Sequence, residues 1–521
     1  METIRNIVIV GGGTAGWMTA AALSKILGPQ YADITLVESE DIGTVGVGEA
    51  TIPQINIFNR LLGLKEDDFI RQTNGTFKLG IEFVDWARKG HSYFHPFGPY
   101  GFDMKGVSFH AFWQKLQTLG VSDSISDYNL QAVAARDGKF MRPVQVENSP
   151  LSTIAYAFHF DAGLYAKFLR RFSEGLGAQR IEGRIVSADK NADTGFLEAV
   201  VLNDGRRIEG DLFIDCSGFR GLLIGQQMGV GYEDWSKWLP NNRAWAVPTE
   251  RVPSRSEALG QNKYANPTPY TRSTAREAGW QWRIPLQHRT GNGYVFSNNF
   301  IDEQAAMDTL LQNLDAKPLK DPMLIKFQGG HRHKFWEKNV VAIGLASGFM
   351  EPLESTSIHL IQVGIAKLLQ MFPDKGFEQA DINRYNMMSV REYEYIRDFL
   401  VLHFNQTERD DSEYWRYCRN MELPPRLQEK YDLFQSRGRI FRENEELFND
   451  TSWFAVMVGQ GMTWRGYDPV ADVMTDEDVK RQLFGIKDAI RKSSDYMPTH
   501  EDFIRANCAM DAPVEVMSQL A

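Results

Sequence analysis

Asn6-Ile-Val-Ile-Val-Gly-Gly-Gly-Thr-Ala-Gly16 is the stretch that decides the fold expected for this chain. Its first five residues are an apolar, β-branched run that predicts a buried strand, and residues 17–27 continue as a helix. A second apolar run, residues 33–37, predicts a strand that ends on Glu38. A strand, a glycine turn, a helix and another strand therefore form a βαβ unit at the N-terminus.

The glycine spacing in the turn is typical of dinucleotide binding. Gly11 permits a tight turn, Gly13 lets the backbone approach a pyrophosphate, and Gly16 lets the helix pack on the strand. The phosphates are expected on the free amides at the start of the helix. Glu38 lies where an acidic side chain can bond a ribose hydroxyl. The predicted dinucleotide contacts in this unit are Gly11, Gly13, Thr14, Ala15, Gly16 and Glu38.

Later glycine-containing blocks favour FAD over NAD. Residues 211–221 resemble the strand-plus-glycine element found late in folds of the flavin monooxygenase type. Residues 341–352 occupy the place where aromatic hydroxylases of that fold bring a strand end to the flavin, so Leu345 is a predicted contact. An earlier glycine-rich segment is expected against the same ligand through Gly48 and Ala50. The sequence has no second such loop for a nicotinamide cofactor, which suggests that a separate flavin reductase supplies reduced FAD.

Composition and net charge indicate a globular protein that does not bind nucleic acid. The chain has 521 residues, of which 43% are hydrophobic and 24% charged, as in an ordinary globular protein. Its net charge of −10 argues against nucleic acid or an anionic membrane as a partner. No signal peptide and no membrane-spanning run is visible, so a cytoplasmic location is expected.

No metal site is predicted. Cys216, Cys418 and Cys508 lie far apart in the sequence and are interpreted as buried or idle thiols. His331 and His333 form a His-x-His pair without further ligands nearby, and we interpret them as surface or substrate-channel residues.

The predicted strands of one sheet are separated by long insertions, which indicates domains interleaved along the chain. We expect an α/β protein with a Rossmann-like, FAD-binding body of the flavin monooxygenase type in residues 1–385. Insertions near residues 88–150 would form a substrate wall, with residues 90–110 irregular. Residues 386–521 are expected to form a mainly helical region that caps the substrate site.

Three motifs carry a family resemblance. All three follow the dinucleotide loop in sequence. They are Gly75-Thr-Phe-Lys-Leu-Gly80, Trp280-Gln-Trp-Arg-Ile-Pro285 and Glu351-Pro-Leu-Glu-Ser-Thr-Ser357. Together they resemble the flavin-dependent halogenases, most closely the tryptophan-halogenase branch. The resemblance implies that Lys78 and Glu354 deliver an electrophilic halogen made from halide at the flavin. Burial would favour deprotonation of Lys78, and Glu354 could act as a base toward the aromatic ring.

Each of these assignments has a competing interpretation. Lys78 could be a solvated lysine that begins a helix, and Glu354 could be a charge at a helix N-terminus. Glu351 is a second candidate for the catalytic carboxylate in the same block. The indoles of Trp280 and Trp282 are interpreted as packed wall residues near the flavin rather than as catalytic groups.

The halide site implied by the resemblance lies at Thr356 and Ser357, at the start of a long predicted helix with free amides. The family usually has glycine at the second position, so Ser357 is a departure that could alter halide preference. Whether chloride or bromide is preferred stays open.

The resemblance is weaker at the substrate end. His95-Pro-Phe97 matches the family motif that walls the ring pocket, and alignment of the C-terminal region places Glu443 and Phe448 at substrate positions. The tyrosine pair that holds the amino-acid backbone in tryptophan halogenases falls on Ser436 and Arg437. Indole or another electron-rich aromatic is therefore the predicted substrate, and free tryptophan a poor one.

Two alternative functions stay open at this point. A flavin-dependent aromatic hydroxylase would share the FAD motifs but would need no halide. A flavin-binding sensor would bind the cofactor without turnover. The family also implies a possible homodimer.

Overall fold

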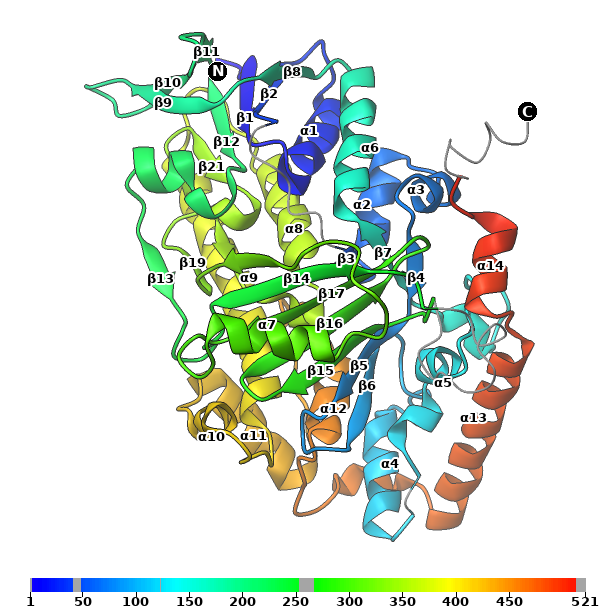
Figure 1. Ribbon diagram of the computed structural model, residues 1–521. Helices are drawn as coiled ribbons and strands as arrows, with labels where there is room; N and C mark the ends of the chain where they lie inside the picture. The colour runs from blue at the N-terminus through cyan, green and yellow to red at the C-terminus, as the bar shows by residue number, and fades with distance from the viewer. Residues whose placement is uncertain (1, 41–47, 122, 253–266, 512–521) are drawn as a thin grey trace.

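A computed structural model describes residues 2–40, 48–121, 123–252 and 267–511 (Figure 1). β1 (Asn6–Val10), α1 (Thr14–Leu27) and β2 (Asp33–Glu38) form the predicted βαβ unit, with β1 and β2 parallel. Side chains of β1 alternate between two hydrophobic cores, which explains why the whole run is apolar.

The six-stranded sheet at the top of Figure 1 is assembled from distant parts of the chain. Its order is β20-β21-β12-β1-β2-β8, and only the edge strand β20 is antiparallel. The added strands are β8 (Gln179–Glu182), β12 (Leu212–Asp215), β20 (Trp336–Glu337) and β21 (Val340–Ala342). The strands of this sheet are therefore separated by long insertions, as predicted, whereas the interleaving of domains stays a prediction.

The sequence also predicts hairpin strands over residues 181–187, 197–202 and 208–215, with a turn at Asn203-Asp-Gly205, and this prediction is half right. β10 (Leu197–Leu202) and β11 (Arg207–Glu209) pair as a hairpin across the Asn-Asp-Gly turn, with β9 (Ile185–Lys190) on the other side. β12 was expected to extend the hairpin, but it pairs in parallel with β1. Its fully buried sequence suits the interior of a parallel sheet better than an exposed hairpin.

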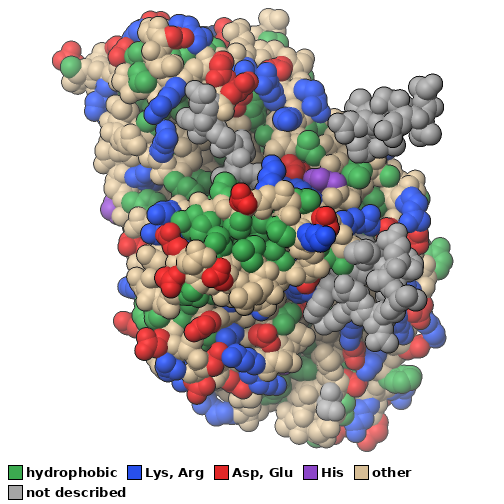
Figure 2. All heavy atoms as spheres, in the orientation of Figure 1, with side chains coloured by type: hydrophobic (Ala, Val, Ile, Leu, Met, Phe, Trp, Pro, Cys, Tyr) green, Lys and Arg blue, Asp and Glu red, His purple; other side chains and the backbone are tan. Residues whose placement is uncertain are grey.

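A seven-stranded sheet lies across the middle of the molecule (Figure 1), in the order β18-β14-β17-β16-β15-β5-β6. The strands are β5 (Gly80–Val84), β6 (Ser92–Pro96), β14 (Arg243–Thr249), β15 (Thr271–Arg276), β16 (Gly279–Pro285), β17 (Thr290–Phe296) and β18 (Met323–Lys326). β6 falls in the segment that was expected to be irregular, so that expectation is wrong. Figure 2 shows apolar side chains gathered over β14 and β17 on this face.

Two three-stranded sheets complete the strand structure. One joins β3 (Gly48–Ala50), β7 (Ala157–Asp161) and β4 (Thr76–Lys78), and the other joins β13 (Tyr232–Asp234), β19 (Gly330–Arg332) and β22 (Gly348–Phe349). His331 on β19 is buried against Trp235, contrary to the expectation that it lies at the surface or in a channel.

Helices surround the sheets. Those before residue 357 are α2 (Ile55–Leu62), α3 (Glu66–Gln72), α4 (Phe109–Thr118), α5 (Leu130–Arg136), α6 (Ala162–Gly175) and α7 (Glu303–Gln312). The later ones are α8 (Ser357–Gln370), α9 (Gln379–Asn405), α10 (Glu413–Asn420), α11 (Pro425–Arg437), α12 (Asp450–Gly459), α13 (Asp476–Tyr496) and α14 (His500–Asn507). The expected division after residue 385 falls inside the continuous helix α9, and the two-part organisation stays a prediction.

Within the described ranges, no helix is long and apolar enough to cross a bilayer. The three cysteines are buried and free. No group of three or more metal-ligating side chains occurs among the described residues.

Candidate active site

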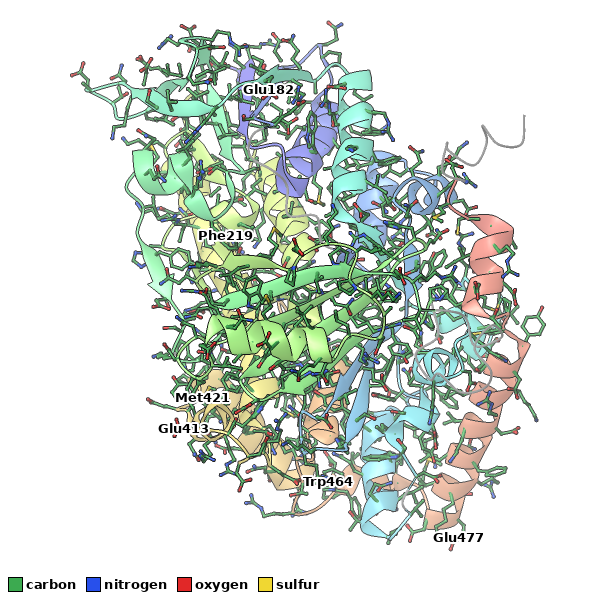
Figure 3. All side chains as sticks on the ribbon, viewed as in Figure 1. Glu182, Phe219, Glu413, Met421, Trp464 and Glu477 are labelled. Atoms are coloured by element: carbon green, nitrogen blue, oxygen red, sulfur yellow. The ribbon has the colours of Figure 1, made fainter. Side chains whose placement is uncertain are left out.

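A cavity of about 440 Å³ lies where the carboxyl ends of β1 and β2 meet the seven-stranded sheet. Trp280, Trp282 and Ile284 of β16 line one wall, and Phe219, labelled in Figure 3, lines the cavity from the segment after β12. Nearly all of the predicted dinucleotide contacts line it: Gly11, Gly13, Thr14, Ala15, Glu38, Gly48, Ala50 and Leu345. Gly16 lies behind this lining.

The glycines of the loop have the geometry that their spacing predicts. Gly11 has a φ of +108°, and a Cβ there would lie 2.4 Å from the Cys216 carbonyl oxygen. A Cβ on Gly13 would meet nothing within 4 Å, so the backbone faces open space. A Cβ on Gly16 would lie 1.8 Å from the Gly11 carbonyl oxygen, because the helix packs directly on the turn. The residues present therefore fit a dinucleotide pyrophosphate.

Glu38 closes one end of the loop. Its carboxylate lies against the backbone of Gly12, where a Cβ would be 1.4 Å from Glu38 Oε2. Arg180 Nε on β8 lies 2.5 Å from the other oxygen, Oε1. The ion pair orients the carboxylate at the loop, where the predicted contact with a ribose hydroxyl requires an acceptor.

Lys78 ends β4 and is fully buried. Its Nζ donates to the Thr51 carbonyl oxygen at 3.0 Å and to Ser355 Oγ at 2.7 Å, and lies 5.2 Å from the centre of the Phe97 ring. Burial lowers the pKa of Lys78 to about 7, although the charge of Glu354 opposes the shift. A substantial fraction of the amine is therefore neutral near pH 7, and the alternative of a solvated lysine at a helix start is wrong.

Glu354 lies in a short 3-10 turn, Pro352–Glu354, just before α8 and is also fully buried. His95 Nδ1 lies 2.9 Å from Oε2, and His403 Nε2 lies 2.8 Å from Oε1. Burial alone would raise the pKa of this carboxyl, but the two histidines outweigh it and lower the pKa to about 2. Glu354 is therefore ionised at neutral pH.

Glu351 lies three positions earlier in a different environment. Its Oε2 accepts from Trp280 Nε1 at 2.5 Å and from Asn241 Nδ2 at 2.8 Å. Its Oε1 is buried without a hydrogen-bond partner among the described residues. Burial raises the pKa of Glu351 to about 7 despite both donors. Glu351 therefore anchors the indole of Trp280, whereas Glu354 is the carboxylate on the Lys78 side.

The predicted halide positions lie at the start of α8. Thr356 immediately precedes the helix and is buried, and its Oγ1 has no hydrogen-bond partner within the described part of the chain. Ser357 is the first helical residue and lines the cavity, as does Ser355. The first amides of the helix are thus available beside the cavity and next to Glu354.

The predicted substrate residues separate into two groups. His95, Phe97 and Phe448 lie around Lys78 and Glu354: the Phe448 ring is 6.2 Å from His95 and stacks on Phe399 at 3.8 Å between ring centres. Glu443 is exposed in the segment between α11 and α12. In the described residues its charge acts on Tyr395, and no contact with Lys78 or Glu354 is found.

Sequence reasoning missed His403. It is a single histidine inside the long helix α9, with no motif around it, so nothing in the sequence indicated a contact with Glu354. Tyr93, which contacts His403, could have been found from the two-residue period of β6, had that strand been predicted.

The glycine-loop cavity, with the buried Lys78 bonded to Ser355 of its lining and the buried Glu354 next to that serine, has the features expected of a flavin enzyme of the halogenase class. The profile of the tryptophan halogenase family matches residues 6–476, and the chain belongs to this family. The predicted family and the predicted α/β, Rossmann-like fold are thereby confirmed.

Individual relatives support the same assignment across nearly the whole chain. The flavin-dependent halogenase Xcc4156 from Xanthomonas campestris is 48% identical, with a TM-score of 0.92 over 98% of this chain and 100% of that one. BrvH, a flavin-dependent halogenase from Brevundimonas sp. BAL3, is 45% identical, with a TM-score of 0.92 over 97% and 99% of the two chains. Tryptophan 6-halogenase SttH from Streptomyces toxytricini is 33% identical over 96% of this chain and 98% of its own length.

Proposed function

We propose that this halogenase uses reduced FAD, oxygen and a halide ion to halogenate an electron-rich aromatic, namely indole or an indole derivative. The observation that carries the proposal is the pair formed by Lys78 and Glu354: both are fully buried, the pKa of the amine is lowered to about 7, and the carboxylate is ionised. A hydroxylase needs no such pair beyond its flavin, and the family assignment does not favour that alternative.

The glycine loop and the first amides of α1 would hold the pyrophosphate of FAD, and Glu38 the ribose. Leu345, Gly48 and Ala50 line the same cavity. Reduced FAD bound there would supply, with oxygen, the oxidising power that turns a halide into an electrophilic halogen. The halide would lie at the start of α8, where Thr356 and Ser357 offer backbone donors.

Lys78 would receive and orient the electrophile. Near pH 7 its amine is partly neutral, so it can act as a hydrogen-bond donor or as a nucleophile toward halogen. Its bond to Ser355 Oγ holds the amine beside the residue that follows Glu354. Glu354, as a carboxylate, would stabilise positive charge on the ring and accept the ring proton once the carbon–halogen bond has formed.

The substrate proposal rests on what surrounds this pair. His95, Phe97 and Phe448 provide an apolar, aromatic wall that suits a planar ring. In the sequence alignment, Ser436 and Arg437, which end α11, take the place of the tyrosine pair that clamps the amino-acid backbone in tryptophan halogenases. Relatives whose names specify tryptophan differ in the carbon they halogenate, at position 6 for SttH and position 7 for RebH from Lentzea aerocolonigenes. Family membership therefore leaves the reacting carbon undetermined.

A separate flavin reductase would supply reduced FAD as a transient partner. We also propose that the protein is a homodimer and that it is cytoplasmic. Size-exclusion chromatography with light scattering measures the oligomeric state directly.

The test combines purified protein, a generic flavin reductase, FAD and an equimolar mixture of bromide and chloride. Indole and L-tryptophan are offered separately and the products identified by mass spectrometry. We expect halogenated indole as the main product; a strong preference for tryptophan would contradict the substrate proposal. Lys78→Ala should abolish halogenation while flavin oxidation continues, and Lys167→Ala, at an exposed helix position, is the matched control.

A further inference from the structure

Glu354 is held between two histidines that are distant in sequence. His95 lies on β6 and contacts both oxygens of the carboxylate, at 3.0 and 2.9 Å. His403 lies in α9 and approaches Oε1 at 2.8 Å. All three side chains are buried, so water cannot replace a lost contact readily.

The protonation state of His403 follows from its two neighbours. Burial lowers the pKa of His403 even though Glu354 acts in the opposite direction, so the imidazole carries one proton at neutral pH. A carboxylate only accepts, so the nitrogen that faces Glu354, Nε2, carries the proton, although the angle of this 2.8 Å contact is not that of a hydrogen bond. The other nitrogen, Nδ1, lies 2.9 Å from the hydroxyl oxygen of Tyr93 and accepts a hydrogen bond from that hydroxyl. Burial and the charge of Glu354 hold the pKa of Tyr93 well above its usual range, so Tyr93 remains a donor.

The fold keeps this chain of donors rigid. Tyr93 and His95 are two residues apart on β6 and therefore project from the same face of the strand. The ring of Phe83 on β5 stacks on Tyr93 at 4.9 Å and on His403 at 4.6 Å. One strand thus contacts Glu354 directly through His95 and indirectly through Tyr93 and His403.

We propose that His403 and Tyr93 are positioning residues for halogenation. Tyr93 fixes the tautomer of His403, and His403 keeps Glu354 ionised and in one orientation toward the substrate. The proposal deepens the proposed function, because it assigns a task to two residues behind the catalytic carboxylate. Neither residue touches the flavin cavity.

The protonation of Glu354 is the diagnostic property. The groups that face it are His95 from β6, His403 from α9 and the ammonium of Lys78 from β4. Removing the His403 donor leaves the carboxylate less stabilised, so its pKa should rise and protonation should extend to higher pH. We expect the pH of half-protonation to increase by about 1 to 3 in His403→Leu.

The measurement is infrared difference spectroscopy of the holoenzyme as a function of pH, with Glu354→Gln to assign the carboxyl signal. His403→Leu should show a protonated Glu354 at pH values where the unaltered protein has none. Its kcat should fall by about 10- to 100-fold, with a new loss of activity on the acidic side. KM for indole should change little. His403→Gln restores an N–H donor and should recover most of kcat.

Tyr93→Phe is the milder variant and keeps the packing on Phe83. Its kcat should fall by about 3- to 10-fold, because the proton of His403 is free to move to Nδ1. Tyr467→Phe, which removes a hydroxyl bonded to Asp472 at 3.0 Å, is the matched control and should have no effect. Bound FAD absorbance and circular dichroism verify that each variant is folded.

An equal loss of activity at every pH, without a change in Glu354 protonation, would make His403 a packing residue and overturn the proposal. Full activity in His403→Leu would do the same. If Glu354 titrates as expected but the unaltered protein forms no halogenated product, the proposed function fails and the proton arrangement stands.

Discussion

Replacing Lys78 with Met should stabilise the protein, and more strongly at low pH than at high pH. The unaltered lysine has its pKa lowered from 10.5 to about 7 in the folded protein. In the unfolded chain the amine has its ordinary pKa. Between these two values the unfolded chain binds the additional proton, so the stability of the unaltered protein rises with pH across this window. Below about pH 7 the amine is charged in both states and its contribution no longer changes.

The size of the effect follows from the lowered pKa. A decrease from 10.5 to about 7 means that burying the charged amine costs about 5 kcal/mol at pH values below the folded pKa. At about pH 9 the folded protein holds the neutral amine, and only about 2 kcal/mol of that cost remains. Met at this position does not titrate. The stability difference between variant and unaltered protein should therefore be about 3 kcal/mol larger at about pH 6 than at about pH 9.

Loss of the two Lys78 hydrogen bonds, to Thr51 and Ser355, adds a penalty that does not depend on the charge of the amine. The comparison therefore uses the change with pH and not the absolute stability. Urea unfolding of both proteins, followed by circular dichroism at the two pH values, measures it. Lys167→Met, at an exposed position, is the control. If Lys78→Met and the unaltered protein lose stability in parallel as pH falls from 9 to 6, the lysine is not held at a lowered pKa and the reasoning is refuted.

Four further changes test other parts of the site. Trp280→Phe removes a donor from the buried Glu351 carboxyl and should lower unfolding free energy by about 1 to 3 kcal/mol, measured by urea unfolding; an unchanged value would contradict the anchoring role. Ser357→Gly removes the side chain that departs from the family pattern and should shift the ratio of brominated to chlorinated product in a competition assay, whereas an identical ratio would show that the serine does not face the halide. Phe448→Ala should raise KM for indole by about 10-fold through loss of ring contact, and a fall in kcat alone would place Phe448 outside the ring wall. Gly16→Ala should prevent FAD retention on gel filtration, because its Cβ would lie 1.8 Å from the Gly11 carbonyl oxygen; normal retention would contradict the close packing of α1 on the turn.

The dinucleotide-binding unit could be predicted in detail because its requirements are local. Gly11, Gly13 and Gly16 lie within six residues of sequence. The backbone conformation and packing that each glycine permits depend mainly on the loop and helix around it. The Asn-Asp-Gly turn between β10 and β11 is local in the same sense. β12 and β6 were misread, because the choice between parallel pairing, antiparallel pairing and an irregular wall depends on partners that are distant in sequence.

The proposed catalytic pair, Lys78 and Glu354, shows most clearly what the sequence could not predict. The motifs alone pointed to Lys78 and to Glu354 over Glu351, but they contained no information on charge. The pKa of Glu351 is raised to about 7 and that of Glu354 lowered to about 2, although the two residues are separated by one short turn. Desolvation by the surrounding core and the placement of His95 and His403 cause this difference. Sequence therefore determined which groups are available for chemistry, and only the tertiary structure decided their protonation, because protonation depends on charges and burial supplied by distant segments.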